Sequence, residues 1–330
     1  MNYFAGIDVS KATLDVTVLN AGKNLLYGRF ANNVKGHKEM LKWLNAGQVV
    51  LGETLFCMEN TGLYSRPLML FLSVHGYKVW VVMPIVIKRS IGLQRGKNDK
   101  ADSGRIAFYA SKNYSTSTSA DIPSASVLAL KDWLAFRDRL VKQKQQLQQP
   151  VNEFADMGLI SQAKEMNKAL QPVINAVNKS IKHVEMAIRK LIRQHQDIKQ
   201  VYDLMLSVPG VGAITAWYLL AYSNAMRNFN NAKQLACYCG VAPFEHSSGT
   251  SVKGKKRVSV MANKQLKSLL HLGALTIIKN KNSEMYDYYE RKVTQGKNKM
   301  SVINALRNKM LQRIVSVVKN NKTYHSKIAA

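Results

Sequence analysis

Four acidic side chains stand where a carboxylate could do chemistry. Asp8 lies within the first apolar segment of the chain, and Glu59 ends a second one. Asp99 and Asp102 are three residues apart at the start of a predicted helix, which places them on one of its faces. Singly, each acid could be structural, because buried acids can be paired and acids at a helix start are favoured by the helix dipole. Together they predict one carboxylate cluster.

A cluster of carboxylates predicts bound divalent cations. Carboxylates that crowd together repel one another and stay ionised only with cations between them. Oxygen-only ligands select hard ions, so we expect Mg²⁺ or Mn²⁺. Two such ions, roughly 4 Å apart, can activate an attacking oxygen and stabilise a leaving oxygen in phosphoryl transfer. The expected cofactor is therefore a pair of Mg²⁺ or Mn²⁺ ions per site, bound by Asp8, Glu59, Asp99 and Asp102.

The charge of the chain indicates what such a site would act on. The 330 residues include 48 Lys and Arg against 20 Asp and Glu, a net charge of +28. This excess of positive charge favours a nucleic-acid partner. The alternative is a ribosomal protein or a protein with a merely basic surface. Residues 1–125 carry a net +7 and residues 126–330 a net +21. We therefore expect the carboxylate chemistry in the first part and most of the nucleic-acid grip in the rest.

Cysteine usage and hydropathy exclude other classes. The three cysteines, Cys57, Cys237 and Cys239, form no CxxC pair, which argues against a disulfide framework and a structural zinc site. No signal peptide is recognisable, and no apolar run is long enough to span a membrane. We expect a soluble cytoplasmic protein, associated with the nucleoid and without a membrane partner.

The elements that must position the acids follow the order of an RNase H-like α/β fold. Three strands form an antiparallel meander, and a helix and alternating strands and helices come next. In the second strand Leu14, Val16 and Val18 alternate with other residues, which is typical of a β-strand. The predicted strands are Tyr3–Val9, Thr13–Leu19, Leu25–Phe30, Thr54–Met58 and Lys78–Met83, and the helices Lys35–Leu44, Tyr64–Val74 and Ala101–Ser111.

The remainder predicts two further domains. Residues 126–200 read as two long helices interrupted by Pro150 and Gly158. Six apolar residues in them follow a heptad pattern, which is typical of a coiled coil and serves either dimerisation or an intramolecular core: Ile174, Val177, Ile181, Val184, Ile188 and Leu191. Residues 201–330 read as mainly helical, with a loop over 245–257. The expected domains are thus 1–125, 126–200 and 201–330.

Five short motifs resemble those of a known family, the DEDD transposases. These are insertion-sequence recombinases with a RuvC-like domain, and they include the pilin-gene invertase Piv and recombinases guided by a bridge RNA. The matching segments are Gly6–Lys11, Glu59–Tyr64, Lys97–Asp102, Ser207–Gly212, and Gly240–Pro243 with Ser248–Gly254. The order and spacing agree along nearly the whole chain, although Ser103 stands where the family favours Ala and Lys253 where it favours Arg.

The resemblance implies more than a metal site. Members join DNA through a serine that becomes covalently linked to phosphate, and motif position assigns this role to Ser248, with Ser251 as runner-up and Ser247 as a close neighbour. It also implies a homo-oligomer, a dimer or tetramer, in which one subunit's acids meet another's serine. The implied partners are double-stranded donor and target DNA and a structured guide RNA.

Two further segments are candidate nucleic-acid contacts. The basic run beside Ser248 is either a solvated loop or a phosphate clamp, and its position favours the clamp. The amides around Gly210 and Gly212 could hold a phosphate or simply start a helix. The candidate contacts are Lys253, Lys255, Lys256, Arg257, Gly210 and Gly212.

Two other functions remain open on the sequence. One is a metal-dependent junction nuclease in which water attacks and Ser248 is structural. The other is a non-catalytic nucleic-acid-binding derivative of a transposase, which the intact set of four acids makes the weaker alternative.

Overall fold

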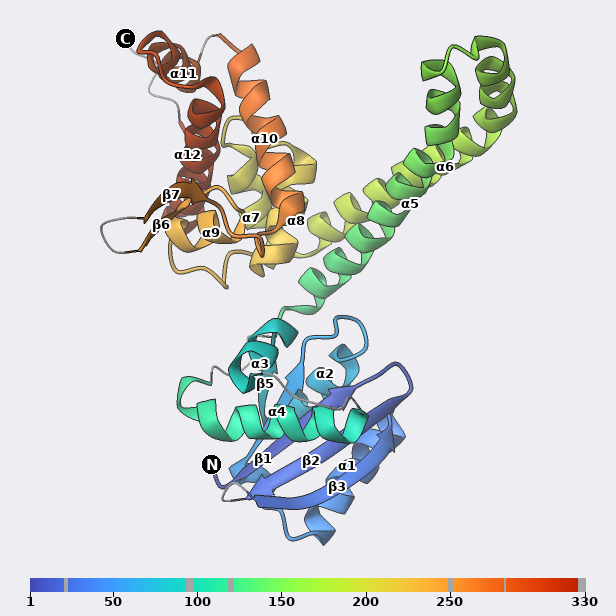
Figure 1. Cartoon of the computed structure of the whole chain (residues 1–330), viewed down its shortest axis with the longest axis vertical. Coiled ribbons are helices and arrows are strands. Elements are labelled where there is room, and N and C mark those ends of the chain that lie inside the picture. Colours follow the sequence, from blue (N-terminus) through green and yellow to red (C-terminus); the bar gives the residue numbers. More distant parts are fainter. Residues whose placement is uncertain (21–22, 93–97, 118–121, 249–251, 282, 326–330) are drawn as a thin grey trace. The chain divides into compact units, whose positions relative to one another are not determined.

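The chain folds into two compact units, Met1–Ile122 and Pro123–Ala330. The computed structural model describes residues 1–20, 23–92, 98–117, 122–248, 252–281 and 283–325 (Figure 1). Within these ranges, no helix combines the length and the apolar character that a membrane span requires. The division expected between residues 200 and 201 stays a prediction.

The first unit is a five-stranded mixed sheet with helices on both faces. The strand order is β3-β2-β1-β4-β5; β1, β2 and β3 are antiparallel, whereas β4 runs parallel to β1 and β5 parallel to β4. This topology fits the predicted RNase H-like fold. The elements are β1 (Tyr3–Val9), β2 (Thr13–Asn20), β3 (Lys23–Ala31), α1 (Val34–Ala46), β4 (Thr54–Glu59), α2 (Arg66–Val74), β5 (Lys78–Val82), α3 (Pro84–Ile91) and α4 (Asp99–Asn113).

Strand β2 packs against helices on both of its faces. Its apolar residues alternate with Asp15 and Thr17, and these two are only 2% and 4% exposed. The reason is α4, which packs on the side of the sheet that carries them (Figure 1). Helices α1 and α2 cover the opposite side with residues such as Met40 and Leu72. Both faces of β2 are therefore buried.

Two contacts fix α4 tightly against the sheet. A Cβ atom at Gly6 of β1 would lie 2.1 Å from the backbone nitrogen of Ala107 and 2.3 Å from the carbonyl oxygen of Ser103, so only glycine allows this approach. The hydroxyl groups of Thr17 and Ser103 are hydrogen-bonded at 2.7 Å in a buried position. The serine that departs from the family's preferred alanine thus has a partner in this chain.

The second unit is mainly helical around one continuous core. Residues from the long helix pair, including Leu134 and Ile188, share this core with Trp217, Leu270 and Ile314 of the later helices. The elements are α5 (Ala125–Asp156), α6 (Ile160–Gln194), α7 (Gln196–Leu206), α8 (Ala213–Ser223), α9 (Ala232–Tyr238), β6 (Phe244–Ser248), β7 (Val252–Arg257), α10 (Lys264–Lys279), α11 (Glu284–Thr294) and α12 (Lys299–Asn320).

Helices α5 and α6 pair as a hairpin, but only one of the two predicted breaks occurs. Gly158, with φ of +80°, lies in the turn between them, where glycine is unstrained. Pro150 lies inside α5, which continues to Asp156; the proline removes one backbone hydrogen bond without ending the helix. Val184 and Ile188 of the heptad seam are buried in the core of this unit. The seam therefore packs within the chain, and its use in dimerisation stays a prediction.

The predicted loop over residues 245–257 is in part a hairpin. Strands β6 and β7 are antiparallel, with Ser248 opposite Val252. Strand pairing satisfies backbone amides and carbonyls that a loop would leave to water. Ser, Gly and Lys content alone indicated a loop, so the expectation for the paired part was wrong.

Candidate active site

The sheet places two of the predicted acids side by side. The parallel register of β1 and β4 sets Ile7 beside Met58. Asp8 and Glu59 are the next residue on each strand, and partners in a parallel pair extend to the same face of the sheet. That face is the one covered by α4, and both side chains are half-buried there.

Helix α4 brings the other two acids to the same edge. Its N-cap is Asn98, whose side chain accepts a hydrogen bond of 2.7 Å from the backbone amide of Ala101. Asp99 and Asp102 occupy the first turn, where a negative charge is favoured by the helix dipole. Asp99 is exposed, whereas Asp102 is partly covered.

The four carboxylates interact electrostatically. Burial raises the pKa of Asp8 above its usual range, and the negative charges of Asp102, Asp99 and the buried Asp15 raise it further. Burial likewise raises the pKa of Glu59, with added contributions from Asp8 and Asp102. Burial and mutual repulsion therefore both disfavour the ionised forms of Asp8 and Glu59 at this edge of the sheet.

Removal of the Asp8 carboxyl group should stabilise the metal-free protein at neutral pH. Because the pKa of Asp8 is higher in the folded state, the folded protein binds this proton more tightly than the unfolded chain does. The folded state therefore loses stability as pH rises above the ordinary Asp value of 3.8 and Asp8 ionises. In EDTA, Asp8→Asn should raise the unfolding temperature at neutral pH, with the gain vanishing below that value. Calorimetry across pH measures this, and a variant less stable than wild type at neutral pH would contradict it.

Two arginines hold the helix-borne acids. Arg105 Nη1 lies 2.6 Å from Asp102 Oδ1, and Arg29 Nη2 lies 3.3 Å from Asp99 Oδ2. With the side chains placed this way, no three His, Cys, Asp or Glu residues in the described part of the chain are arranged to hold a metal ion. The donor set nevertheless fits a hard divalent cation, because all four side chains are carboxylates.

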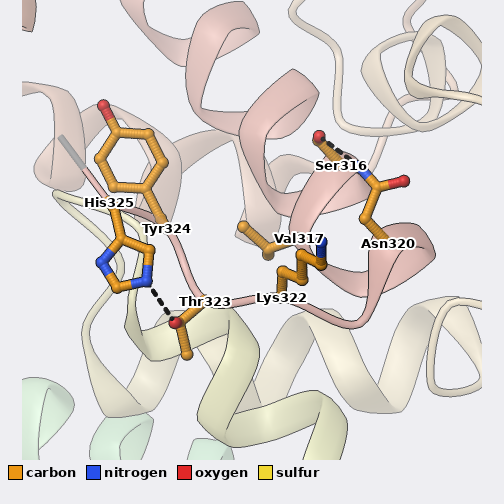
Figure 2. Close-up of a pocket in the computed structure, with 7 residues that line it drawn as sticks. All are labelled: Ser316, Val317, Asn320, Lys322, Thr323, Tyr324 and His325. Carbon is orange, nitrogen blue, oxygen red and sulfur yellow. Dashed lines mark hydrogen bonds between the residues drawn. The ribbon is translucent and has the colours of Figure 1, made fainter. Parts of the chain in front are cut away.

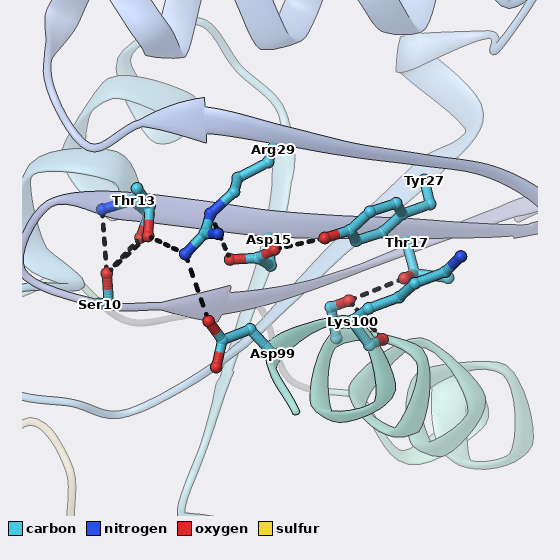
Figure 3. Close-up of polar contacts among 9 residues, drawn as sticks. Ser10, Thr13, Asp15, Thr17, Tyr27, Arg29, Asp99 and Lys100 are labelled. Atoms are coloured by element: carbon cyan, nitrogen blue, oxygen red, sulfur yellow. Dashed lines mark hydrogen bonds and ion pairs between the residues drawn. The ribbon is translucent and has the colours of Figure 1, made fainter. Parts of the chain in front are cut away.

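A polar network that was not predicted from the sequence lies beside these acids. The hydroxyl group of Tyr27 donates a hydrogen bond of 2.6 Å to Asp15 Oδ1, and Arg29 Nε lies 3.5 Å from Asp15 Oδ2. Figure 3 shows the Arg29 side chain between Asp15 and Asp99. The available signal was an acid, Asp15, within the predicted strand Thr13–Leu19.

The predicted serine and basic residues lie in the second unit. Ser248 is the last residue of β6, and its side chain lies outside the described part of the structure, as does the whole of Ser251. Ser247 pairs with Lys253 in the hairpin, and β7 carries the basic run up to Arg257. The side chains of this run, including Lys255 and Lys256, are likewise not described.

The two predicted glycines differ in their surroundings. Gly210 has φ of +83°, and a Cβ atom there would lie 2.8 Å from the carbonyl oxygen of Gly273 on α10. Its conformation and this close approach explain glycine without a ligand. Gly212 is the exposed N-cap residue of α8, and nothing lies within 4 Å of an added Cβ atom. A phosphate contact at either position stays a prediction.

The second unit has a hollow of about 420 Å³ at the C-terminal end of α12. Figure 2 shows its lining, which includes Lys322, Tyr324 and His325 and contains no acidic residue. It therefore lacks the ligands that carboxylate-based metal chemistry needs.

Fold and site together define a class. A sheet of this order, with acids at the ends of two neighbouring parallel strands and on the covering helix, is that of RNase H-like enzymes acting on nucleic acid. Two family models match the chain: one described as a DEDD transposase of IS110 type over residues 5–156, and one described as the transposase IS116/IS110/IS902 family over residues 202–290. The chain belongs to this family of transposases. The first match includes all four acids, and the second includes Ser248.

Similarity to individual proteins extends over the whole chain. The pilin gene-inverting proteins of Moraxella bovis and Moraxella lacunata are each 25% identical over 337 residues, which cover 98% of this chain and 98% of each relative. The transposase for insertion sequence element IS1111A of Coxiella burnetii is 24% identical over 352 residues, 97% of this chain and 90% of the relative. Among solved structures, T. thermophilus RuvC in complex with a Holliday junction substrate matches 35% of this chain and 96% of its own, with 13% identity and a TM-score of 0.28.

Proposed function

We propose that this protein cuts and rejoins DNA strands through a covalent serine–DNA link, at a site where four carboxylates bind divalent cations. The observation that carries the proposal is the acidic edge: Asp8 and Glu59 lie at the same end of neighbouring parallel strands, and the first turn of α4 adds Asp99 and Asp102. Burial, and to a lesser degree the neighbouring carboxylates, raise the pKa of Asp8 and of Glu59, which supports a site that takes up cations.

The proposed chemistry is an exchange of phosphodiester bonds. The hydroxyl oxygen of Ser248 attacks a DNA phosphorus atom, so a serine–phosphate bond forms as the bond to the 3′ oxygen breaks. The serine proton is released and the departing 3′ oxygen takes up a proton. Attack by another strand's 3′ hydroxyl group reverses these steps and frees the serine. Since one phosphodiester replaces another, rejoining needs no ATP.

The carboxylates would hold the cations, which we propose to be two Mg²⁺ or Mn²⁺ ions. When bound, the ions supply charge stabilisation for the attacking and leaving oxygens. Asp8 and Glu59 are anchored in strands and would provide a rigid half of the site. Asp102 would complete it by turning from Arg105 towards the cations, and Asp99 would offer its Oδ1 while its Oδ2 stays paired with Arg29.

The partners that we propose follow from charge and family. Residues 126–330 carry most of the net +28, which supports a nucleic-acid surface in the second unit. We propose double-stranded donor and target DNA, a structured guide RNA, and a dimer or tetramer in which acids and serine come from different subunits. The place of action would be the cytoplasm, at the nucleoid. RNA that co-purifies with the protein and is required for cleavage would support the guide.

Trapping tests the role of the serine. Incubation with labelled DNA carrying the element's ends should give an adduct that survives denaturation and disappears in Ser248→Ala. Ser251→Ala is the matched control and should retain the adduct. Loss in Ser251→Ala alone would move the nucleophile to that position.

The same experiment separates the other functions. Cleavage that survives Ser248→Ala without an adduct would support a nuclease that uses water. If Asp8→Asn and Asp102→Asn leave every activity unchanged, only a non-catalytic binding protein remains.

The basic run of β7 should contribute to the salt dependence of DNA binding. A plot of log binding constant against log salt has a negative slope, and each lost phosphate contact makes it shallower by about 0.9. Neutralising Lys255, Lys256 and Arg257 should therefore reduce the magnitude of the slope by about two to three. An equal number of charges removed from exposed positions of α1 provides the control: Lys35, Lys38 and Lys42. Titrations at several salt concentrations measure the slope. Equal slopes for the β7 variant and wild type would mean that the basic run is exposed to solvent and does not contact phosphates.

A further inference from the structure

Arg29 connects the acidic edge to a buried carboxylate beneath it. Its Nη2 faces Asp99 Oδ2 at 3.3 Å, and its Nε faces Asp15 Oδ2 at 3.5 Å. The same Nη2 lies 3.4 Å from the hydroxyl oxygen of Thr13, which is itself hydrogen-bonded to Ser10 in the turn that follows β1 (Figure 3). The guanidinium group therefore joins this turn, β2 and the start of α4.

Asp15 has the character of an anchor. It is 2% exposed, and both of its oxygens are engaged, Oδ1 by the hydroxyl group of Tyr27 and Oδ2 by Arg29. A buried carboxylate requires such partners, because an unpaired buried charge is strongly unfavourable. In the antiparallel register Asp15 lies directly opposite Asp8, so the anchor stands next to the proposed metal ligands.

Asp99 is the acid that most needs positioning. Asp8 and Glu59 are set in strands, and Asp102 is held by Arg105 at 2.6 Å. The Asp99 side chain is 58% exposed at the first residue of α4. Such a side chain has rotamer freedom to lose when it binds an ion, unless a neighbour has already restricted it.

We propose that Asp15, Tyr27 and Arg29 form a positioning network for Asp99. The buried carboxylate and the phenol orient the guanidinium group, which holds Oδ2 of Asp99 and so fixes the direction of Oδ1. This inference rests on the proposed function, because it takes Asp99 as a cation ligand. None of the three residues touches the cation: they act through Asp99.

A positioning role and a purely electrostatic role for Arg29 predict opposite changes in cation affinity when Arg29 is removed. Arg29 brings a positive charge close to the cation site, so its removal should tighten cation binding if Coulomb repulsion dominates. If Arg29 positions Asp99, its removal should weaken binding, and residues that orient metal ligands typically change affinity by about ten-fold or more. The sign of the change therefore decides between the two roles.

The experiment measures Mn²⁺ binding to the full-length protein by calorimetry. Arg29→Gln is expected to raise the dissociation constant about ten-fold, and Arg29→Lys, which keeps the charge but loses the planar fork, to raise it less. Lys35→Gln on α1 is the control, since it removes one positive charge from an 88% exposed position on the other side of the sheet. Unchanged or tighter binding in Arg29→Gln would overturn the network.

Two further variants separate an effect on cation binding from an effect on folding. Arg29→Gln alone leaves the buried Asp15 carboxylate without its cationic partner, which destabilises the fold. Asp15→Asn combined with Arg29→Gln removes both partners and avoids this loss of stability. The double variant should bind Mn²⁺ no more weakly than the single ones, because the residues act as a unit. Asp99→Asn distinguishes a failure of the proposed metal site from a failure of the positioning network. If it leaves Mn²⁺ affinity unchanged, the proposed metal site is wrong; if it weakens binding while Arg29→Gln does not, only the network is wrong.

Discussion

Asp8→Asn is expected to lower the rate of DNA cleavage by about a thousand-fold or more. The substitution keeps the shape of the side chain and removes its charge from the centre of the acidic edge. Cation-based stabilisation of phosphoryl transfer contributes several kcal/mol, and each 1.36 kcal/mol is worth about ten-fold in rate. The measurement is strand cleavage under single-turnover conditions with saturating Mg²⁺.

The controls distinguish lost chemistry from lost folding or binding. Asp8→Asn should still bind DNA, because the net charge of the protein becomes more positive. Glu39→Gln removes an exposed acid of the same unit, on α1, and should cleave like wild type. Cleavage by Asp8→Asn within a few-fold of wild type would remove this residue from the site.

Gly6→Ala should unfold or inactivate the first unit. The added Cβ atom would lie 2.1 Å from a backbone atom of Ala107, and a backbone cannot move aside as a flexible side chain can. Overpacking of this kind costs about 1–3 kcal/mol and occasionally more. The displaced element would be α4, so Asp99 and Asp102 would move with it. Denaturant unfolding and cleavage assays measure both effects.

Gly104→Ala is the matched control, with an opposite expected sign. Gly104 lies inside α4, and nothing stands within 4 Å of an added Cβ atom. Alanine is preferred to glycine within a helix by about 0.8–1.0 kcal/mol, so this variant should be more stable than wild type. If Gly6→Ala were as stable as Gly104→Ala, the tight packing of α4 on β1 would be wrong.

Local patterns were sufficient to predict the elements that carry the four acids. Apolar segments that contain Asp8 or end in Glu59 indicated two strands, and Asp99 and Asp102 stand at the start of a predicted helix. These signals are carried by neighbouring residues, which is why the positions of β1, β4 and α4 could be predicted from the sequence.

The network around Asp15 could not be predicted in the same way. It joins residues from β2, β3 and α4, and the sequence shows neither the pairing nor that α4 covers the polar side of β2. The alternation rule holds only where one face of a strand meets water. Helix α3 was not predicted: Pro84 directly follows the predicted strand Lys78–Met83, where it stops the strand, but proline is also favoured in the first turn of a helix.

The role of Ser248 could not be predicted from local sequence patterns. Nothing in the residues around Ser248 indicates a nucleophile by itself, and the assignment depends on the position of a family motif. The acids and the serine also lie in different units, so their meeting in one site is part of the proposal.

Crystals grown with Mn²⁺ offer the most direct test of the central claim. An anomalous difference map should show manganese at the edge where β1 and β4 end, within ligand distance of Asp8, Glu59 and the two acids of α4, with Asp102 turned from Arg105 and Asp99 still paired with Arg29. A map without manganese at this edge, or with the four side chains still apart at saturating Mn²⁺, would contradict the account.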